Sequence, residues 1–261
     1  MINKVLFWNI RSVRTQKSFE RLIDLHRRNH YSYIALLEPF QNPAELERYR
    51  IKLGMPKAKA SSSAKIWIFW KDDWEEQDYN DTGQQLTVNF QKRGTTDIFS
   101  VTAVYARCNA LERLELWESL EDIAFKMQKP WLVGGDFNTI RSESEKLGGL
   151  PVTQLETIDF NLCISSCALN ELNFKGSSFT WWNGRVGAEC IFERLDRVFG
   201  NEEFMNLLPN NEVQHLIRQG SDHAPLQGEI TGNPFTVVHS KMKKVKLEIA
   251  KWSKKTFGNV F

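Results

Sequence analysis

The sequence lacks long apolar runs, and no stretch approaches the roughly 20 apolar residues that a helix needs to cross a bilayer. It also lacks the basic, apolar and small-residue order of a signal peptide, because Met1 to Lys4 leads directly into an apolar segment. Its four cysteines form no CxxC pair, which favours half-buried reduced thiols. A two-cysteine metal site at Cys163 and Cys167 is a remote alternative. We expect an intracellular protein that does not bind membranes.

Nucleotide-binding and serine-hydrolase motifs are also missing. No GxGxxG sequence follows an apolar run, no GxxxxGKS sequence occurs, and no serine stands in a GxSxG sequence. These absences argue against a dinucleotide-binding fold, a P-loop NTPase and a catalytic triad built on a serine elbow. Any catalytic chemistry must therefore come from other side chains.

Positive charge is concentrated at the C-terminal end. The net charge is +2, but residues 241–261 carry seven Lys and one Glu, which leaves a slightly acidic body. We interpret 1–232 as one domain and 233–261 as a basic amphipathic tail. A solvated helix is the simplest interpretation of the tail, a nucleic-acid backbone contact is the functional alternative, and a membrane-surface helix is weaker still. Four apolar residues of the tail lie at helical spacing: Met242, Val245, Ile249 and Trp252.

The stretch from Pro130 to Asn138 is the centre of the functional prediction. It begins as an apolar run typical of a buried strand and ends on a carboxylate, Asp136, and a carboxamide, Asn138. In extended chain these two side chains point to the same side, and the two preceding glycines allow backbone or ligand to come close. An Asx turn is the alternative, because Gly-Asp-x-Asn commonly forms one.

Apolar runs and helical periodicities alternate in an order that occurs twice, in 1–106 and 130–230. This order predicts an α/β (α+β) four-layer αββα sandwich, with two packed mixed β-sheets and helices outside. The expected strands are 5–10, 34–38, 65–71, 86–90, 97–106, 130–138, 178–183, 191–199, 212–217 and 224–230. The expected helices are 18–30, 44–53, 111–127, 153–166 and 202–208, and 57–64 is expected to be a polar loop.

Several expected strands end in a polar residue, so we expect these side chains to gather at one rim of the sandwich. Oxygen ligands without a Cys/His cluster favour Mg²⁺, with Mn²⁺ as the alternative. Glu38 is the best primary ligand because no base is adjacent to it in sequence. The polar residues are Asn9, Glu38, Tyr105, Asp136, Asn138, Asp196, Asp222 and His223.

The neighbours Asp222 and His223 point to opposite sides of an extended chain, so we expect Asp196 to fix the tautomer of His223. Taken singly, each polar residue has a plain structural explanation: a turn, a half-buried ring or, for Asp196, a surface ion pair. Taken together, the residues fit hydrolysis of a phosphodiester by direct attack of water.

Seven short motifs carry a resemblance to a known family: Phe7-Trp8-Asn9-Ile10-Arg11, Leu36-Leu37-Glu38-Pro39, Val104-Tyr105-Ala106, Gly134-Gly135-Asp136-Phe137-Asn138, Phe179-Thr180-Trp181, Arg194-Leu195-Asp196-Arg197 and Ser221-Asp222-His223. In this order they resemble the endonuclease/exonuclease/phosphatase superfamily, whose fold is DNase I-like. Segments 130–138, 180–185 and 193–197 more narrowly resemble the endonuclease domain of plant LINE-type (non-LTR) retrotransposons. The end, 251–261, resembles the linker that follows that domain, and no reverse transcriptase follows it here. We expect an isolated, truncated or domesticated module.

The resemblance implies a role for each matching residue. It assigns metal binding to Glu38, Asn9 and Asp222, and it also gives Asp222 a role beside the leaving group. It assigns activation of water to Asp136, stabilisation of the pentavalent phosphorus to Asn138, and contact with the phosphate to His223, oriented by Asp196. It assigns substrate contacts to Tyr105, Asn9, Thr180 and Ser221.

The function implied by the resemblance is Mg²⁺-dependent nicking of DNA, in the nucleus, by a monomer without an obligate protein partner. Two alternatives stay open. One is another phosphoesterase of the superfamily: a phosphoinositide phosphatase, a sphingomyelinase or an RNA deadenylase. The other is a catalytically silent nucleic-acid-binding remnant of a retroelement. The sequence departs from plant relatives at Ser12, where they often have glycine, and in a shorter segment after Ile230.

Overall fold

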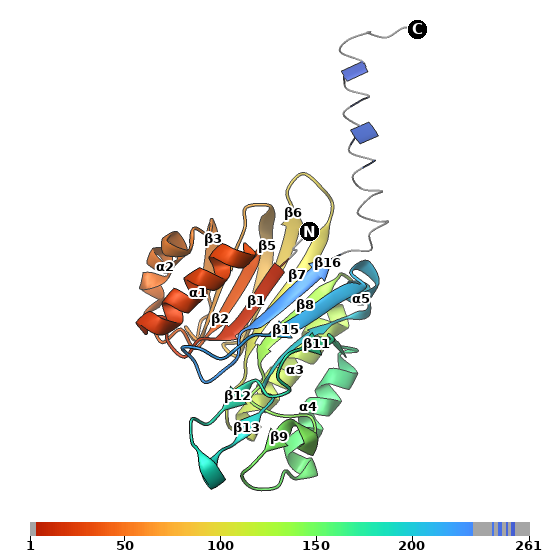
Figure 1. Ribbon diagram of the computed structural model, residues 1–261. Helices are drawn as coiled ribbons and strands as arrows, with labels where there is room; N and C mark the ends of the chain where they lie inside the picture. Colours follow the sequence, from red (N-terminus) through yellow and green to blue (C-terminus); the bar gives the residue numbers. More distant parts are fainter. Residues whose placement is uncertain (1–3, 232–241, 243–244, 247–248, 250–251, 254–261) are drawn as a thin grey trace.

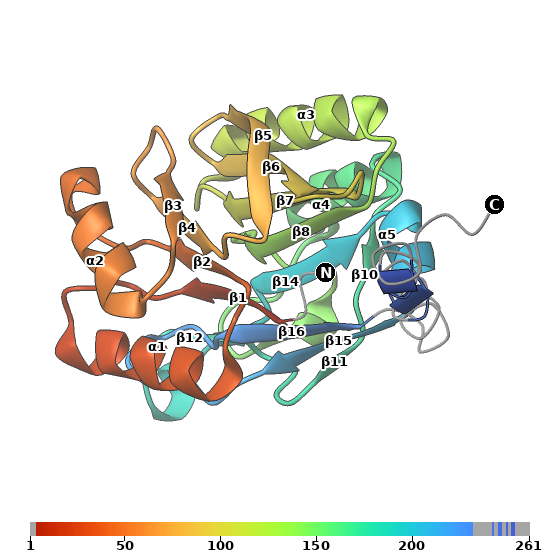
Figure 2. The ribbon, with the colours of Figure 1, turned by 90° about the horizontal axis from the view of Figure 1, so that it is seen from above.

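The computed structural model describes residues 4–231 and, within the tail, residues 242, 245, 246, 249, 252 and 253. Two large sheets pack face to face with helices on both outer faces, which gives four layers (Figure 2). The predicted αββα sandwich is therefore confirmed. The described tail residues are helical, and the rest of the predicted tail, 233–261, lies outside the described residues.

The larger sheet is mixed, because β1 pairs in parallel with β2 and antiparallel with β16. Its seven strands follow the order β11 (Phe174–Lys175), β15 (Asn210–His215), β16 (Leu226–Thr231), β1 (Lys4–Asn9), β2 (Tyr33–Leu37), β4 (Ile66–Trp70) and β3 (Lys57–Ala60).

The second sheet is also mixed, with β7 parallel to β8 and the other pairs antiparallel. Its six strands follow the order β10 (Asn170–Glu171), β14 (Asp196–Gly200), β8 (Trp131–Asp136), β7 (Ile98–Tyr105), β6 (Gln85–Lys92) and β5 (Trp74–Asp81). A small third sheet consists of β12 (Trp181–Trp182), β13 (Phe192–Glu193) and β9 (Lys146–Leu147).

Helices α1 (Gln16–Asn29) and α2 (Leu46–Leu53) cover the seven-stranded sheet, and α3 (Ala110–Lys126) and α4 (Gln154–Ser166) cover the six-stranded sheet (Figures 1 and 2). The short helix α5 (Glu202–Leu207) follows β14. Short 3-10 turns are η1 (Pro43–Glu45), η2 (Glu143–Glu145) and η3 (Gly187–Glu189). Among the described helices, none has the length and apolar character needed to cross a membrane.

The central strands are apolar on both faces because each face has a separate core to fill. In β1, Val5 and Phe7 face the core between the sheets, whereas Leu6 and Trp8 pack toward the helix layer with Leu22 of α1. The ends of the predicted helix 44–53 also follow the expected chemistry. Asn42 caps the turn η1, which leads into α2, and Gly54 ends α2 in the left-handed conformation.

Close contact between the two sheets depends on glycine at one position of β8. A Cβ added at Gly134 would lie 2.8 Å from the ring of Phe7 in the opposite sheet. At Gly135, with φ at +144°, a Cβ would overlap the Val104 carbonyl of the neighbouring strand. The expectation that these glycines allow close backbone approach is confirmed.

Some of the sequence-based boundaries are wrong. Part of the expected loop 57–64 is strand β3, an edge strand packed under α2 whose Lys-Ala-Lys-Ala sequence lacks the usual β-branched residues. The edge strand β5 escaped prediction because it is largely charged and exposed, as edge strands often are. The expected strand 178–183 shrinks to β12, and 191–199 divides into β13 and β14.

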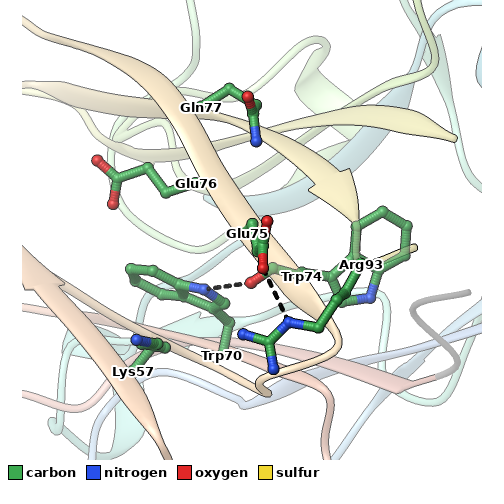
Figure 3. A pocket seen from close by; sticks show the side chains of 7 residues that line it. All are labelled: Lys57, Trp70, Trp74, Glu75, Glu76, Gln77 and Arg93. Carbon is green, nitrogen blue, oxygen red and sulfur yellow. Dashed lines mark hydrogen bonds and ion pairs between the residues drawn. The ribbon is translucent and has the colours of Figure 1, made fainter. Parts of the chain in front are cut away.

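A cavity of about 500 Å³ lies between the edge strands of the two sheets (Figure 3). The strand registers place it at the rim opposite the polar strand ends, because Trp70 pairs with Tyr33 whereas Ile66 pairs with Leu37, beside Glu38. It therefore lies away from the predicted site. Its lining residues are Lys57, Trp70, Trp74, Glu75, Glu76, Gln77 and Arg93.

Candidate active site

Strand pairing brings the predicted site residues to one rim of the sandwich. In the six-stranded sheet, Asp136 lies directly opposite Tyr105 of β7 and Asp196 of β14. In the other sheet, Asn9 ends β1 next to the end of β2, and Glu38 follows β2. The site is thus built by the facing ends of both sheets.

Asp136 is fully buried, and both of its oxygens accept hydrogen bonds. Asn9 Nδ2 donates to Oδ2 at 2.9 Å from the opposite sheet, and the backbone N–H of Asn138 donates to Oδ1 at 2.9 Å. The second bond is an Asx-type turn, and Asn138 has φ at +48°. The extended geometry expected for Asp136 and Asn138 is therefore wrong, although the two residues do meet.

His223 is buried and paired with the carboxylate expected to orient it. Its Nδ1 lies 2.9 Å from Asp196 Oδ2, and its Nε2 lies 3.8 Å from Asp136 Oδ2. Asp196 is itself buried, so the alternative of a surface ion pair is wrong. With Nδ1–H donating to Asp196, Nε2 is the nitrogen directed toward Asp136.

The buried titratable groups of this cluster shift one another's pKa. Burial raises the pKa of Asp136 to about 7, with Asp196 adding to the rise and His223 opposing it. Burial alone would lower the pKa of His223, but Asp196 and Asp136 outweigh it and raise that pKa to about 9. The two carboxylates therefore favour the protonated form of the imidazole, and burial favours the protonated form of Asp136.

Glu38 is surrounded by donors that the sequence did not predict. Tyr105 Oη donates to its Oε1 at 2.5 Å, and Arg11 Nη1 donates to its Oε2 at 2.9 Å. Lys65 Nζ lies 3.9 Å from Oε1. No base is adjacent to Glu38 in sequence, but Arg11 and Lys65 lie beside it in space.

Asp222 points to a different side from His223, as expected. Its Oδ2 accepts a hydrogen bond from Trp181 Nε1 at 3.2 Å, and its Oδ1 lies 3.4 Å from Arg11 Nε. The guanidinium of Arg11 therefore bridges Glu38 and Asp222. Trp181 and Arg11 lie within recognised motifs, but their partners are far away in sequence.

Thr180 and Ser221, which were expected to contact the substrate, form hydrogen bonds to the backbone around the site. Thr180 Oγ1 is buried and accepts hydrogen bonds from the backbone N–H groups of Leu195 and Asp196 at 3.1 and 3.0 Å. Ser221 Oγ donates to the Asn9 carbonyl at 2.7 Å and accepts from the His223 N–H at 3.1 Å. These contacts position the ends of β14 and β1.

The carboxylate oxygens at this rim are suitable ligands for a hard divalent cation. Oxygen ligands from Glu38 and Asp222 converge on the Arg11 guanidinium, which shows that this part of the rim binds positive charge. A second group, Asp136, Asp196 and His223, has ligand atoms within 4.8 Å of one another. His223 is already hydrogen-bonded to Asp196, and Asp136 to Asn9, so this group suits proton transfer better than metal coordination.

A sandwich of two mixed sheets with carboxylates, an imidazole and a phenol at one rim is the DNase I-like architecture of phosphoester hydrolases. The chain belongs to the Endonuclease/Exonuclease/phosphatase family, whose sequence pattern matches residues 6–223. This family comprises hydrolases, among them nucleases and phosphatases. A comparison with curated protein sequences gave no match.

Several solved structures share the fold. The endonuclease domain of TRAS1, a telomere-specific non-LTR retrotransposon, is 18% identical, with a TM-score of 0.67 over 87% of this chain and 98% of that chain. The 3′ phosphatase NExo from Neisseria, bound to a product DNA hairpin, is 15% identical, with a TM-score of 0.67 over 88% and 99%. The mannosyl-6-phosphatase Bt3783 from Bacteroides thetaiotaomicron is 14% identical, with a TM-score of 0.60 over 88% and 99%.

Proposed function

We propose that the protein is a Mg²⁺-dependent endonuclease that nicks one strand of DNA, with Mn²⁺ as an alternative metal. The observation that carries the proposal is the buried group in which Asp136 is held by Asn9 and faces His223. A buried base, a protonated donor and a nearby pair of metal-binding carboxylates are what hydrolysis of a phosphodiester by water requires.

In the proposed reaction, Asp136 accepts the proton of the attacking water while the water oxygen bonds to phosphorus. Its raised pKa, about 7, suits a general base near neutral pH. The bond from phosphorus to the 3′ oxygen breaks, and solvent supplies the proton of the new hydroxyl group. His223 Nε2–H and Asn138 donate to the negative phosphate oxygens, and Tyr105 contacts the same phosphate.

Glu38, Asn9 and Asp222 would hold the metal, which supplies positive charge for the phosphate oxygens. Tyr105 orients Glu38 through its 2.5 Å hydrogen bond, and Trp181 orients Asp222. Asp196 acts through His223 by fixing the ring and its tautomer. We further propose that the chain acts as a nuclear monomer, with DNA as its partner.

DNA is favoured over other phosphoesters by the resemblance of segments 130–138, 180–185 and 193–197 to plant LINE-type endonuclease domains. Two of the structural relatives, the TRAS1 endonuclease domain and the DNA-bound NExo, are described as a retrotransposon endonuclease and as a phosphatase on a DNA hairpin. The phosphatase alternative is represented by the mannosyl-6-phosphatase. Arginine and lysine side chains beside Glu38 suit a phosphate backbone.

A supercoiled-plasmid nicking assay tests the proposal. We expect Mg²⁺-dependent conversion to the open circle, and a loss of about 10²- to 10⁴-fold in Asp136→Ala, the range for removal of a general base. Asp97→Asn is the matched control, because Asp97 is an exposed carboxylate of the hairpin at the opposite rim. Phosphate release from phosphoinositides or sugar phosphates without nicking would favour a phosphatase. DNA binding without any hydrolysis would favour a silent remnant.

A further inference from the structure

We propose that the Arg11 guanidinium occupies the position between Glu38 and Asp222 and competes there with the divalent metal. Once the metal has displaced it, Arg11 contacts the DNA backbone. The competition follows from the contacts that Arg11 makes with the two carboxylates. The second half, the DNA contact, rests on the function proposed above.

The guanidinium contacts both carboxylates with different nitrogens. Nη1 lies 2.9 Å from Glu38 Oε2, and Nε lies 3.4 Å from Asp222 Oδ1. The side chain of Glu38 is only 5% exposed, whereas that of Arg11 is 48% exposed. The Glu38 carboxylate is therefore fixed inside the protein, while Asp222, at 29% exposure, and the Arg11 guanidinium approach it from the solvent side.

A metal and this guanidinium cannot share the position without strong repulsion. Magnesium binds oxygen at about 2.1 Å. A metal bonded to Glu38 Oε2 would thus lie no more than about 5 Å from Arg11 Nη1, which is 2.9 Å from that oxygen. Both cations also require the same Asp222 oxygen region, so binding of one weakens binding of the other.

A second contact, with the ring of Phe40, is available to the Arg11 guanidinium. Its Cζ already lies 6.0 Å from the ring of Phe40, an exposed aromatic side chain at the edge of the site. Lys65 Nζ lies 4.3 Å from the same ring. An arginine released from Glu38 would therefore join a lysine around an exposed ring, which is a suitable arrangement for a phosphate group.

The carboxylates keep their orientation when Arg11 leaves. Tyr105 holds Glu38, and Trp181 holds Asp222, each through a hydrogen bond that does not involve Arg11. Removing the guanidinium should thus expose a ready metal site instead of collapsing it. Removal of the Arg11 guanidinium should therefore have opposite effects on the two affinities: the protein should bind the metal more tightly and DNA more weakly.

Metal affinity without DNA tests the competition directly. Mn²⁺ would be titrated into the full chain, with free Mn²⁺ followed by electron paramagnetic resonance. We expect Arg11→Gln to bind Mn²⁺ about five- to tenfold more tightly, as expected for removal of one partly exposed competing charge. Arg11→Lys, which keeps the charge, should stay within about threefold of the unmodified protein.

Arg14→Gln is the matched control, because it removes the same charge from the same loop. Arg14 is exposed, and within the described residues no ion pair involves it. Its Mn²⁺ affinity should equal that of the unmodified protein. Unchanged or weaker Mn²⁺ binding in Arg11→Gln, with an unchanged melting temperature, would overturn the proposal.

The DNA contact is tested in an Asp136→Asn background with metal present, so that no cutting interferes. Adding Arg11→Gln should weaken binding to a short duplex and reduce the salt slope by about one. Equal DNA affinity and an equal salt slope would remove this half of the proposal. Absence of nicking by a protein that binds Mn²⁺ would refute the endonuclease function and leave the Mn²⁺ titration as a valid test of competition.

Discussion

A buried network of ion pairs next to the site should contribute strongly to the free energy of unfolding of the domain. Arg197 of β14 has a side chain with 0% exposure, and its guanidinium pairs with Glu145 and with Glu171. Glu171 Oε1 also accepts from Arg194 at 2.6 Å, and its Oε2 accepts from Arg141 at 3.3 Å. The Glu171 carboxylate thus contacts three arginines, and Glu145 shares two of them.

We expect Glu171→Ala to lower the free energy of unfolding by about 3 kcal/mol. Removing one partner of a buried ion pair typically costs about 3 to 5 kcal/mol, because the remaining charge stays buried. The lower end applies here because Arg197 keeps its contact with Glu145. Within the described residues Nε of Arg197 already lacks a hydrogen-bond partner, so loss of Glu171 leaves a second buried donor unpaired.

Urea denaturation followed by tryptophan fluorescence measures this loss. Glu75→Ala is the control, because Glu75 pairs with Arg93 at 2.8 Å on the surface, where such pairs contribute about 0 to 1 kcal/mol. If Glu171→Ala and Glu75→Ala lose the same small amount, the buried network does not stabilise the fold and the reasoning fails.

Three further outcomes can be measured on the same domain. Burial opposes ionisation of Glu145, but Arg197 outweighs it and lowers the pKa of that carboxyl below its usual value, so its stabilisation is present above about pH 4.5 and fades as pH falls through the lowered pKa. Urea titrations should therefore show the stability difference between the unmodified protein and Glu145→Gln shrinking from pH 7 to pH 3.5; a constant difference would contradict this. Gly134→Ala should lose about 1 to 3 kcal/mol in the same assay, because its Cβ would meet the ring of Phe7. Asp196→Asn should reduce kcat at least about tenfold with little change in KM, because it leaves His223 without its orienting carboxylate; an equal rise in KM would point to a different role.

The gathering of the polar side chains at one rim was predictable, because these residues lie at strand ends. A strand that ends on Asp136 fixes where that side chain lies once the sheet forms. The pairing of Asp196 with His223 was also predictable, since Asp222 cannot reach back around its own backbone to the neighbouring ring. The 2.9 Å contact between Asp196 and His223 confirms that pairing.

The partners of long cationic side chains were not predictable. Arg11 is 27 residues from Glu38, and its reach depends on a left-handed backbone at φ +52° that no local pattern specifies. Ser12, at a position where the plant endonucleases that the sequence resembles often have glycine, follows with φ at +130°. Strands β3 and β5 were missed for a related reason, because they are edge strands whose pairing partners, not their own sequences, make them strands.

The bond from Ser221 to the Asn9 carbonyl joins residues 212 positions apart. Trp8 and His223, on the same two segments, are joined as well, through the Trp8 indole and the His223 carbonyl. During synthesis, the first strand therefore leaves the ribosome long before the segment that completes the rim. The rim cannot assemble on a nascent chain until residues beyond 223 have emerged, so completion of the site is tied to completion of the domain.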